Sequence, residues 1–307
     1  MRRRVFTGLA LAAALAVGQP AIAPPACAKE VKPLRVVYDT IVTGLAYTES
    51  VAYDPHAKVL YASQFGSVLQ PALKGGKGKI AKLSLDGKIL EDQFLPAHGE
   101  IMNKPKGIWV RGGRLWVTDI DGVWEFDLKT RKSRKLMLPG AQFANDPTVQ
   151  GNALYVSDNR TDKLFRVAPA DFLNMKGEPK VTVVFSGKSI NPNGLYPGPN
   201  GSLLMVGFAS PKEPRGIYQM SREGKLRELT GNIGMLDGLY RMRDGSLIAT
   251  DWVSGTVFHW SPKGGQQTIA SGFKGPADLC VVPEKDGLLL VQPDLAANQL
   301  RFIKLAQ

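Results

Sequence analysis

The stretch Leu154-Tyr155-Val156-Ser157-Asp158 is one of six copies of a short apolar strand signature in this 307-residue chain. Each copy begins with leucine, and successive copies start 55, 39, 49, 44 and 41 residues apart. The other copies are Leu60–Ser63, Leu115–Asp119, Leu203–Val206, Leu247–Asp251 and Leu288–Val291. A period of about 40 to 50 residues is typical of repeat architectures such as propellers.

Turns and further strands surround each copy of the signature. Glycine and asparagine supply tight turns before the second to sixth copies, as in Arg111-Gly112-Gly113 and Asn200-Gly201. Alternating segments such as Val123–Asp127 and Gly255–Trp260 follow, and helical periodicity is nearly absent. Units of up to four short strands are propeller blades, and six of them close a ring with few exposed edges. We therefore predict an all-β, six-bladed β-propeller.

The two ends of the chain complete the last predicted blade. Residues 299–305 fit its third strand, and residues 34–41 fit its fourth, so residues 29–307 should form a single domain. The apolar content of 44%, with 33 Gly and 21 Pro, excludes a disordered chain, collagen and a coiled coil. The WD dipeptide is missing, which excludes a WD40 array.

The amino terminus has the pattern of a cleavable export signal. Arg2-Arg3-Arg4 precedes the uncharged run Val5–Val17, and Ala26-Cys27-Ala28 follows. We predict that residues 1–28 are removed and that the protein is periplasmic or secreted. Arg2–Phe6 also fits the twin-arginine pattern, so either export route is open. Lipid attachment at Cys27 is the less favoured alternative, and no transmembrane segment is expected because no other apolar run approaches 18 residues.

The net charge of +12 does not predict a nucleic-acid partner. Three of the positive charges belong to the predicted signal, and the others are spread over predicted turns and strand faces. The densest run, Arg131–Lys135, lies on a predicted outer hairpin, where solvated charges would prevent the exposed strand edge from pairing with another chain.

Cysteine and histidine are too scarce for a soft metal site. The chain has two cysteines and three histidines, with no CxxC or HExxH spacing and no GxSxG elbow for a serine nucleophile. Cys280 lies in an apolar run and is expected to be a small buried hydrophobe. A metal in this protein should therefore be hard and bound through oxygen.

One polar residue lies nine to eleven positions before each signature, where the innermost strand of the blade should begin. These residues are Glu49, Lys106, Asn145, Asn193, Asp237 and Asp278. Their nearly constant register predicts that they converge near one end of the central channel. Carboxylate and amide oxygens suit Ca²⁺ best, with Zn²⁺, Mn²⁺ and Mg²⁺ as further possibilities.

Two simpler interpretations stay open. Asn and Asp at a strand entrance commonly bond neighbouring backbone amides in a tight turn, without any ligand. Lys106 pairs with Asp278 or Glu49, holds an anionic group of a substrate, or extends to solvent.

Four motifs in order resemble the SMP-30/gluconolactonase/luciferin-regenerating-enzyme group of six-bladed propellers, across the whole predicted mature chain. They are Glu49-Ser50-Val51, Asn145-Asp146, Pro192–Leu195 and Asp237-Gly238. The resemblance implies a divalent ion held by Glu49, Asn193 and Asp237, with Asn145 contacting the substrate or completing the site. It also implies that Asp237 activates water for hydrolysis of a lactone or an ester-like small molecule.

The sequence departs from that group at Phe143, where the sugar-lactone enzymes have an arginine, and no basic residue lies nearby in the sequence. We expect a small-molecule substrate, with Lys106 and Asp278 as further substrate contacts and the oligomeric state open. One alternative is a non-enzymatic periplasmic propeller that binds a ligand or a protein partner. Another is a strictosidine-synthase-like or NHL-type propeller, which shares the fold and differs at the ring.

Overall fold

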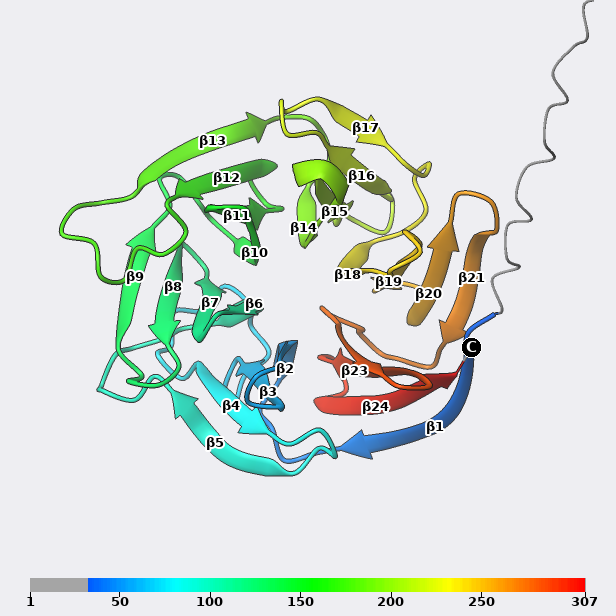
Figure 1. Cartoon of the computed structure of the whole chain (residues 1–307), viewed down its shortest axis with the longest axis horizontal. Coiled ribbons are helices and arrows are strands. Elements are labelled where there is room, and N and C mark those ends of the chain that lie inside the picture. Colours follow the sequence, from blue (N-terminus) through cyan, green and yellow to red (C-terminus); the bar gives the residue numbers. More distant parts are fainter. Residues whose placement is uncertain (1–32, 307) are drawn as a thin grey trace, which may run out of the picture. The chain divides into compact units, whose positions relative to one another are not determined.

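Six four-stranded sheets form a ring in the computed structural model, which describes residues 33–306 (Figure 1). The ring belongs to one compact unit that begins at Leu34. The predicted export signal and Cys27 lie outside the described residues. Within residues 33–306, no helix is long and apolar enough to cross a membrane.

Each blade has its innermost strand at the centre of the ring and its outermost strand at the rim (Figure 1). Blade 1 contains β2 (Thr48–Asp54), β3 (Val59–Gln64), β4 (Lys79–Leu83) and β5 (Ile89–Leu95). Blade 2 contains β6 (Pro105–Arg111), β7 (Arg114–Asp119), β8 (Gly122–Asp127) and β9 (Ser133–Met137). Blade 3 contains β10 (Ala144–Gln150), β11 (Ala153–Asp158), β12 (Lys163–Ala168) and β13 (Lys180–Ser186).

The second half of the ring repeats this order, apart from the last blade. Blade 4 contains β14 (Pro192–Pro197), β15 (Leu203–Gly207), β16 (Ile217–Met220) and β17 (Leu226–Glu228), with a 3₁₀ turn at Pro199–Gly201. Blade 5 contains β18 (Leu236–Arg241), β19 (Leu247–Asp251), β20 (Thr256–Ser261) and β21 (Gly265–Ala270). Blade 6 contains β22 (Cys280–Glu284), β23 (Gly287–Asp294), β24 (Gln299–Ala306) and β1 (Arg35–Val42).

Tight hairpins connect the strands because the turn residues permit them. In the hairpin between β6 and β7, Arg111 pairs with Arg114 across two glycines. Gly112 and Gly113 have φ angles of 59° and 77°, the left-handed region that a two-residue hairpin turn requires. The strand signature that follows such turns is the second strand of its blade.

Strands from both ends of the chain close the last blade. β1 runs antiparallel to β24, with Arg35 opposite Ala306 and Val42 opposite Leu300. This confirms the predicted all-β, six-bladed β-propeller with a last blade shared by the two termini.

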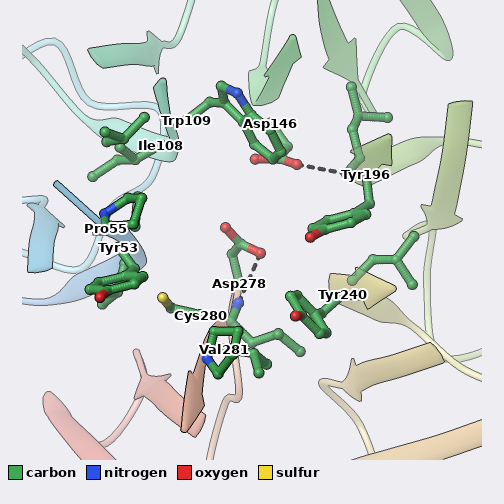
Figure 2. A pocket seen from close by; sticks show the side chains of 17 residues that line it. Tyr53, Pro55, Ile108, Trp109, Asp146, Tyr196, Tyr240, Asp278, Cys280 and Val281 are labelled. Atoms are coloured by element: carbon green, nitrogen blue, oxygen red, sulfur yellow. Dashed lines mark hydrogen bonds between the residues drawn. The ribbon is translucent and has the colours of Figure 1, made fainter. Parts of the chain in front are cut away.

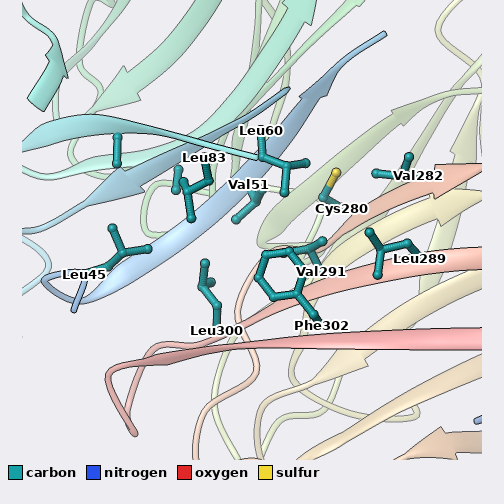
Figure 3. Packing of buried hydrophobic residues seen from close by; sticks show 12 residues of the cluster. Leu45, Val51, Leu60, Leu83, Cys280, Val282, Leu289, Val291, Leu300 and Phe302 are labelled. Carbon is teal, nitrogen blue, oxygen red and sulfur yellow. The ribbon is translucent and has the colours of Figure 1, made fainter. Parts of the chain in front are cut away.

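Apolar side chains fill the space between the first and last blades (Figure 3). Leu60 and Leu83 of blade 1 belong to the same buried cluster as Val291, Leu300 and Phe302 of blade 6. Burial of a large side chain such as Phe302, which is 2% exposed, contributes about 2 kcal/mol. The two ends of the chain are therefore held together by core packing as well as by strand pairing.

Candidate functional site

A β-bulge occurs at the entrance of every innermost strand. In β6, Pro105 pairs with Asp119, but three residues later Ile108 pairs with Val117, so the register shifts by one. The strands β2, β10, β14 and β18 show the same shift at the same point. In blade 6, the bridge between Pro276 and Asp294 precedes the pairing of Cys280, with an equal shift. Bulges re-aim side chains and are common next to functional sites.

Five of the six predicted polar residues occupy the first position of their bulges. All five are buried, with exposed fractions of 6% or less. They are Glu49, Lys106, Asn145, Asn193 and Asp237. The ring fold thus brings residues from five blades to equivalent places at the channel.

Asp278 differs from the predicted register by one residue. Ala277 takes the first position in blade 6, and Asp278 takes the second, which is the place of Ser50 and Asp146 in blades 1 and 3. The turn between β22 and β23 has only two residues, but the paired arms of this hairpin are longer than in the other blades. Leu290, rather than Leu288, therefore takes the place of the signature leucine, and counting back from Leu288 misplaces the bulge. Asp278 is partly exposed, and its Oδ2 accepts a hydrogen bond of 2.5 Å from the Ser50 hydroxyl.

Hydroxyls of the signature strands hold these bulges in place. The Ser157 hydroxyl accepts a hydrogen bond from the Asp146 amide at 2.9 Å and donates to the Asn193 carbonyl of the next blade at 2.7 Å. Thr250 repeats this arrangement with the Gly238 amide and the Ala277 carbonyl. Each bond satisfies a buried backbone group that the register shift leaves unpaired. The Ser or Thr of the signature therefore positions the candidate site.

Glycine follows three of the polar residues because the next blade approaches closely. A Cβ at Gly107 would lie 2.1 Å from Asp146 Oδ1, and one at Gly194 would lie 2.1 Å from the Asp237 carbonyl oxygen. Gly238 meets the Leu279 amide in the same way, at 2.6 Å. The pairs Lys-Gly, Asn-Gly and Asp-Gly in the sequence are thus a consequence of blade packing.

The aspartate that ends the signature has a structural role that the sequence did not reveal. Asp158 accepts hydrogen bonds from the amides of Gln142 and Phe143 at 2.7 and 2.9 Å, and from Thr161 at 3.0 Å. These bonds fix the loop that leads into the Asn145 bulge. Asp119, Asp251 and Asp294 bind loop amides in the same way.

Four carboxyl groups perturb one another around the bulges. Burial and the nearby carboxylates of Asp237 and Asp278 hold the pKa of Glu49 well above its usual range. Burial and Asp278 likewise raise the pKa of Asp237 and of Asp146, and burial raises the pKa of Asp278 to about 6. Raised pKa values of this kind arise where several acidic groups gather in a poorly hydrated place without enough positive charge beside them.

Lys106 is enclosed within the protein, which excludes the alternative that its side chain extends to solvent. Its side chain is 1% exposed, and burial lowers the pKa of its ammonium to about 8, although the Glu49 carboxylate works against this change. The ammonium lies 4.2 Å from the centre of the Phe143 ring. A buried cation over an aromatic face gains a favourable cation–π contact.

The structure supplies a basic residue beside Phe143 that sequence proximity did not reveal. Arg160, in the turn after β11, lies with its guanidinium carbon 4.8 Å from the Phe143 ring centre. Phe143 and Arg160 line a cavity of about 490 Å³ together with residues 69–73. Two cations thus flank Phe143, and the inference that no basic residue is nearby is corrected.

The predicted ligand set for a divalent ion fits one observation in particular. Glu49 Oε2 is buried and has no hydrogen-bond partner among the described residues. Burying an ionised oxygen without a partner is costly, and a cation would offset that cost. Within residues 33–306, no three His, Cys, Asp or Glu side chains are arranged as a metal site, so the candidate depends on the Asn193 amide in addition to Glu49 and Asp237.

Comparisons with known proteins give structural relatives only. No protein-family model matches the chain, and no curated protein matches it significantly. A proposed gluconolactonase is 16% identical, with a TM-score of 0.62 over 89% of this chain and 98% of its own. Regucalcin, a calcium-binding protein from Agrobacterium tumefaciens str. C58, is 17% identical, with a TM-score of 0.59 over 86% and 92%.

A lyase belongs to the same set of structures. A catalytically inactive His-to-Ala variant of virginiamycin B lyase from Staphylococcus aureus, solved with quinupristin, is 15% identical. Its TM-score is 0.57 over 90% of this chain and 100% of its own. At these identities the likeness establishes the propeller fold.

Proposed function

We propose that this protein is a divalent-metal-dependent hydrolase of a lactone or an ester-like small molecule, a distant relative of the SMP-30/gluconolactonase group. Glu49, Asn193 and Asp237 would hold the ion, with Ca²⁺ the best match to their oxygen donors. The observation that carries this proposal is the buried, unpartnered Glu49 Oε2 among carboxyl groups with raised pKa values. The structural likeness to regucalcin and to a proposed gluconolactonase is consistent with it.

The residues around the bulges have separate roles in this proposal. A bound divalent ion would supply a Lewis acid for the carbonyl of the substrate. The Asp237 carboxylate is the candidate base that takes a proton from the attacking water, and a bound ion would lower its pKa and so limit its strength as a base. The hydroxyl adds to the carbonyl carbon, the acyl–oxygen bond breaks, and the leaving oxygen takes the proton. Asn145 orients the substrate through its amide.

The cations beside Phe143 favour a substrate with negative charge or dense oxygen atoms. Lys106 lies 4.2 Å and Arg160 4.8 Å from the ring, so both are within reach of a group bound over Phe143. Asp278, predicted as a substrate contact, lies at the second position of the blade 6 bulge, and its carboxylate accepts a hydrogen bond from the Ser50 hydroxyl. It would act by holding that bulge beside Glu49.

The lyase reaction is not favoured because the histidines lie elsewhere. His56 is in the exposed turn after β2, and His98 is exposed before β6. His259 lies on β20, the third strand of its blade, and pairs with Ile248. None of the three is on an innermost strand.

A panel of sugar lactones, aromatic lactones and aryl esters, assayed with added Ca²⁺, Zn²⁺, Mn²⁺ or Mg²⁺ and again with EDTA, tests the proposal. Hydrolysis that requires metal and is lost in Asp237→Asn supports it, provided that the exposed-site variant Asp286→Asn keeps full activity. Hydrolysis that is unchanged by EDTA and by Asp237→Asn would overturn it.

Export is proposed separately, from the pattern of Arg2–Val17 and Ala26-Cys27-Ala28. Expression of the full chain in a bacterial host, followed by mass measurement of the processed protein, tests it. A mature chain that begins at Lys29 is expected. Retention of residues 1–28, or a lipid on Cys27, would contradict the proposed cleavage.

A further inference from the structure

A second cavity, of about 550 Å³, lies along the channel beyond the bulges (Figure 2). Its walls come from the parts of β2, β6, β14, β18 and β22 that follow their bulges, together with Asp146 and Asp278 from the bulges themselves. None of the five first-position residues lines it, but Asp146 and Asp278, from the second bulge positions of blades 3 and 6, do, so it adjoins the proposed metal site without containing its ligands. A cavity of this size accommodates a small organic molecule.

Aromatic rings form much of the wall. Tyr53, Trp109, Tyr196 and Tyr240 all line the cavity, and Figure 2 shows the tyrosine rings around its centre. Tyr196 packs edge-to-face against both Trp109 and Tyr240, at 5.9 and 5.2 Å between ring centres. This mutual packing gives the rings fixed orientations. Burial raises the pKa of the Tyr196 and Tyr240 phenols, which therefore stay neutral.

The charged residues of the cavity are acidic. Asp146 and Asp278 turn their carboxyl groups toward its middle (Figure 2). They are held there by the Leu195 amide, at 2.6 Å from Asp146 Oδ2, and by the Leu279 amide, at 2.8 Å from Asp278 Oδ1. Arg241 and Arg243 follow Tyr240 in the chain but do not line the cavity.

No Lys, Arg or His is among the described residues that line this cavity, although the chain carries 39 Lys and Arg. Two acidic side chains without a basic partner, inside aromatic and aliphatic walls, favour a cation over an anion, and a bound cation would lower their raised pKa values and keep them ionised. The aromatic faces add attraction for a positive charge that is weakly hydrated. A quaternary ammonium with an apolar body meets both conditions, because it needs no hydrogen-bond acceptors and fills apolar space.

We propose that the channel cavity beyond the bulges is a binding site for an organic cation of the quaternary ammonium class, with Asp278 and Asp146 as counter-ions and Tyr53, Trp109, Tyr196 and Tyr240 as its aromatic walls. Ligand binding here does not require the metal-dependent hydrolysis proposed above, although Asp278 also holds the bulge beside Glu49. Its ligand is recognised by charge and by aromatic contact, whereas the candidate metal site acts through oxygen donors.

Calorimetric titration tests this proposal with two cationic probes, choline and benzyltrimethylammonium. The neutral isostere of choline, 3,3-dimethylbutan-1-ol, is the matched ligand control. All titrations contain EDTA and low salt, so that failure of the metal proposal leaves the measurement unaffected. The processed full-length protein is used, and circular dichroism verifies the fold of every variant.

Saturable binding of at least one cationic probe is expected, with the neutral isostere bound at least about 10-fold more weakly than choline. Asp278→Asn should weaken binding on the order of 30-fold, since a charge partner inside the cavity is removed. Tyr240→Leu should weaken it about 5-fold, and the exposed-site control Asp286→Asn should not change it. These two binding-site variants remove different contacts, so if one of them fails to fold, the other still tests the proposal.

Three outcomes would overturn the proposal. The first is that neither cation binds. The second is that the neutral isostere binds as tightly as choline. The third is that folded Asp278→Asn and Tyr240→Leu both bind the probes with unchanged affinity.

Discussion

The Ser157 hydroxyl joins two blades. It accepts a hydrogen bond from the Asp146 amide of its own blade and donates one to the Asn193 carbonyl of the next blade at 2.7 Å. Ser157 is fully buried, so Ser157→Ala leaves two backbone groups without partners in a dry place. We expect a loss of about 2 kcal/mol in the free energy of unfolding, measured by urea denaturation. Because Asn193 also loses its anchor, any stabilisation by divalent metal should shrink.

Ser67→Ala is the matched control, because Ser67 is exposed in the loop after β3. It should change the free energy of unfolding by less than about 0.5 kcal/mol. Equal stabilities of the two variants would show that the hydroxyl relay between blades does not support the ring.

Gly107→Ala should disturb the second bulge directly. The added Cβ would lie 2.1 Å from Asp146 Oδ1 and 2.7 Å from the Pro147 ring, so either the strand or Asp146 must move. Overpacking of this kind costs about 1 to 3 kcal/mol. Urea denaturation measures this loss, and Gly177→Ala, with no atom within 4 Å of the added Cβ, is the control. Equal stability of both variants would contradict the close packing of Gly107 in blade 2 against Asp146 in blade 3.

The sequence predicted the ring because the information lies in local repeats. Leucine signatures, turn glycines and alternating strands each act over a few residues, and their spacing fixes the number of blades. Closure by both ends was also predictable, because residues 34–41 and 299–305 were the strand patterns that remained. Core packing of Phe302 against blade 1 then follows from the closed ring.

The candidate site was less predictable because it depends on register and on distant loops. The one-residue shift at Asp278 arises because the paired arms of the blade 6 hairpin are longer, so Leu290 and not Leu288 is the equivalent leucine, and arm length is not visible in a count from the leucine signature. The approach of Arg160 to Phe143 depends on how the turn after β11 folds over the loop before β10. Charge alone could not separate the acids near Glu49 from the signature aspartates, such as Asp158, that bind loop amides.

Stability should depend on pH through Asp278. Burial raises the pKa of this carboxyl group from its ordinary value of 3.8 to about 6, so its ionised form is disfavoured in the folded state. The stability that the folded state gains from the neutral carboxyl is fully present below about pH 4, and it is lost as the pH rises toward 6. Asp278→Asn cannot ionise, so it should be more stable than the wild type at pH 7.5, by about 3 kcal/mol. The gap should close near pH 4.

Urea denaturation in EDTA between pH 4 and 7.5 measures this gap. The carbonyl oxygen of the amide introduced by Asp278→Asn can still accept from the Ser50 hydroxyl, which limits the loss of hydrogen bonding. Asp286→Asn is the control, and its stability should follow that of the wild type at every pH. A constant difference between Asp278→Asn and the wild type would contradict the raised pKa.

Divalent metal should stabilise the protein through Glu49. An ion that binds only the folded state adds about 2.7 kcal/mol at 100 times its dissociation constant, which corresponds to a melting temperature higher by about 5 °C. Glu49→Gln removes the unpartnered Oε2 charge, so the metal-free variant should be at least as stable as the wild type while losing the metal shift. Melting curves with EDTA or with Ca²⁺, Zn²⁺, Mn²⁺ or Mg²⁺ measure both effects, and Asp286→Asn should keep the wild-type shift. Unchanged melting with all four ions, or a shift that survives in Glu49→Gln, would exclude Glu49 as a metal ligand.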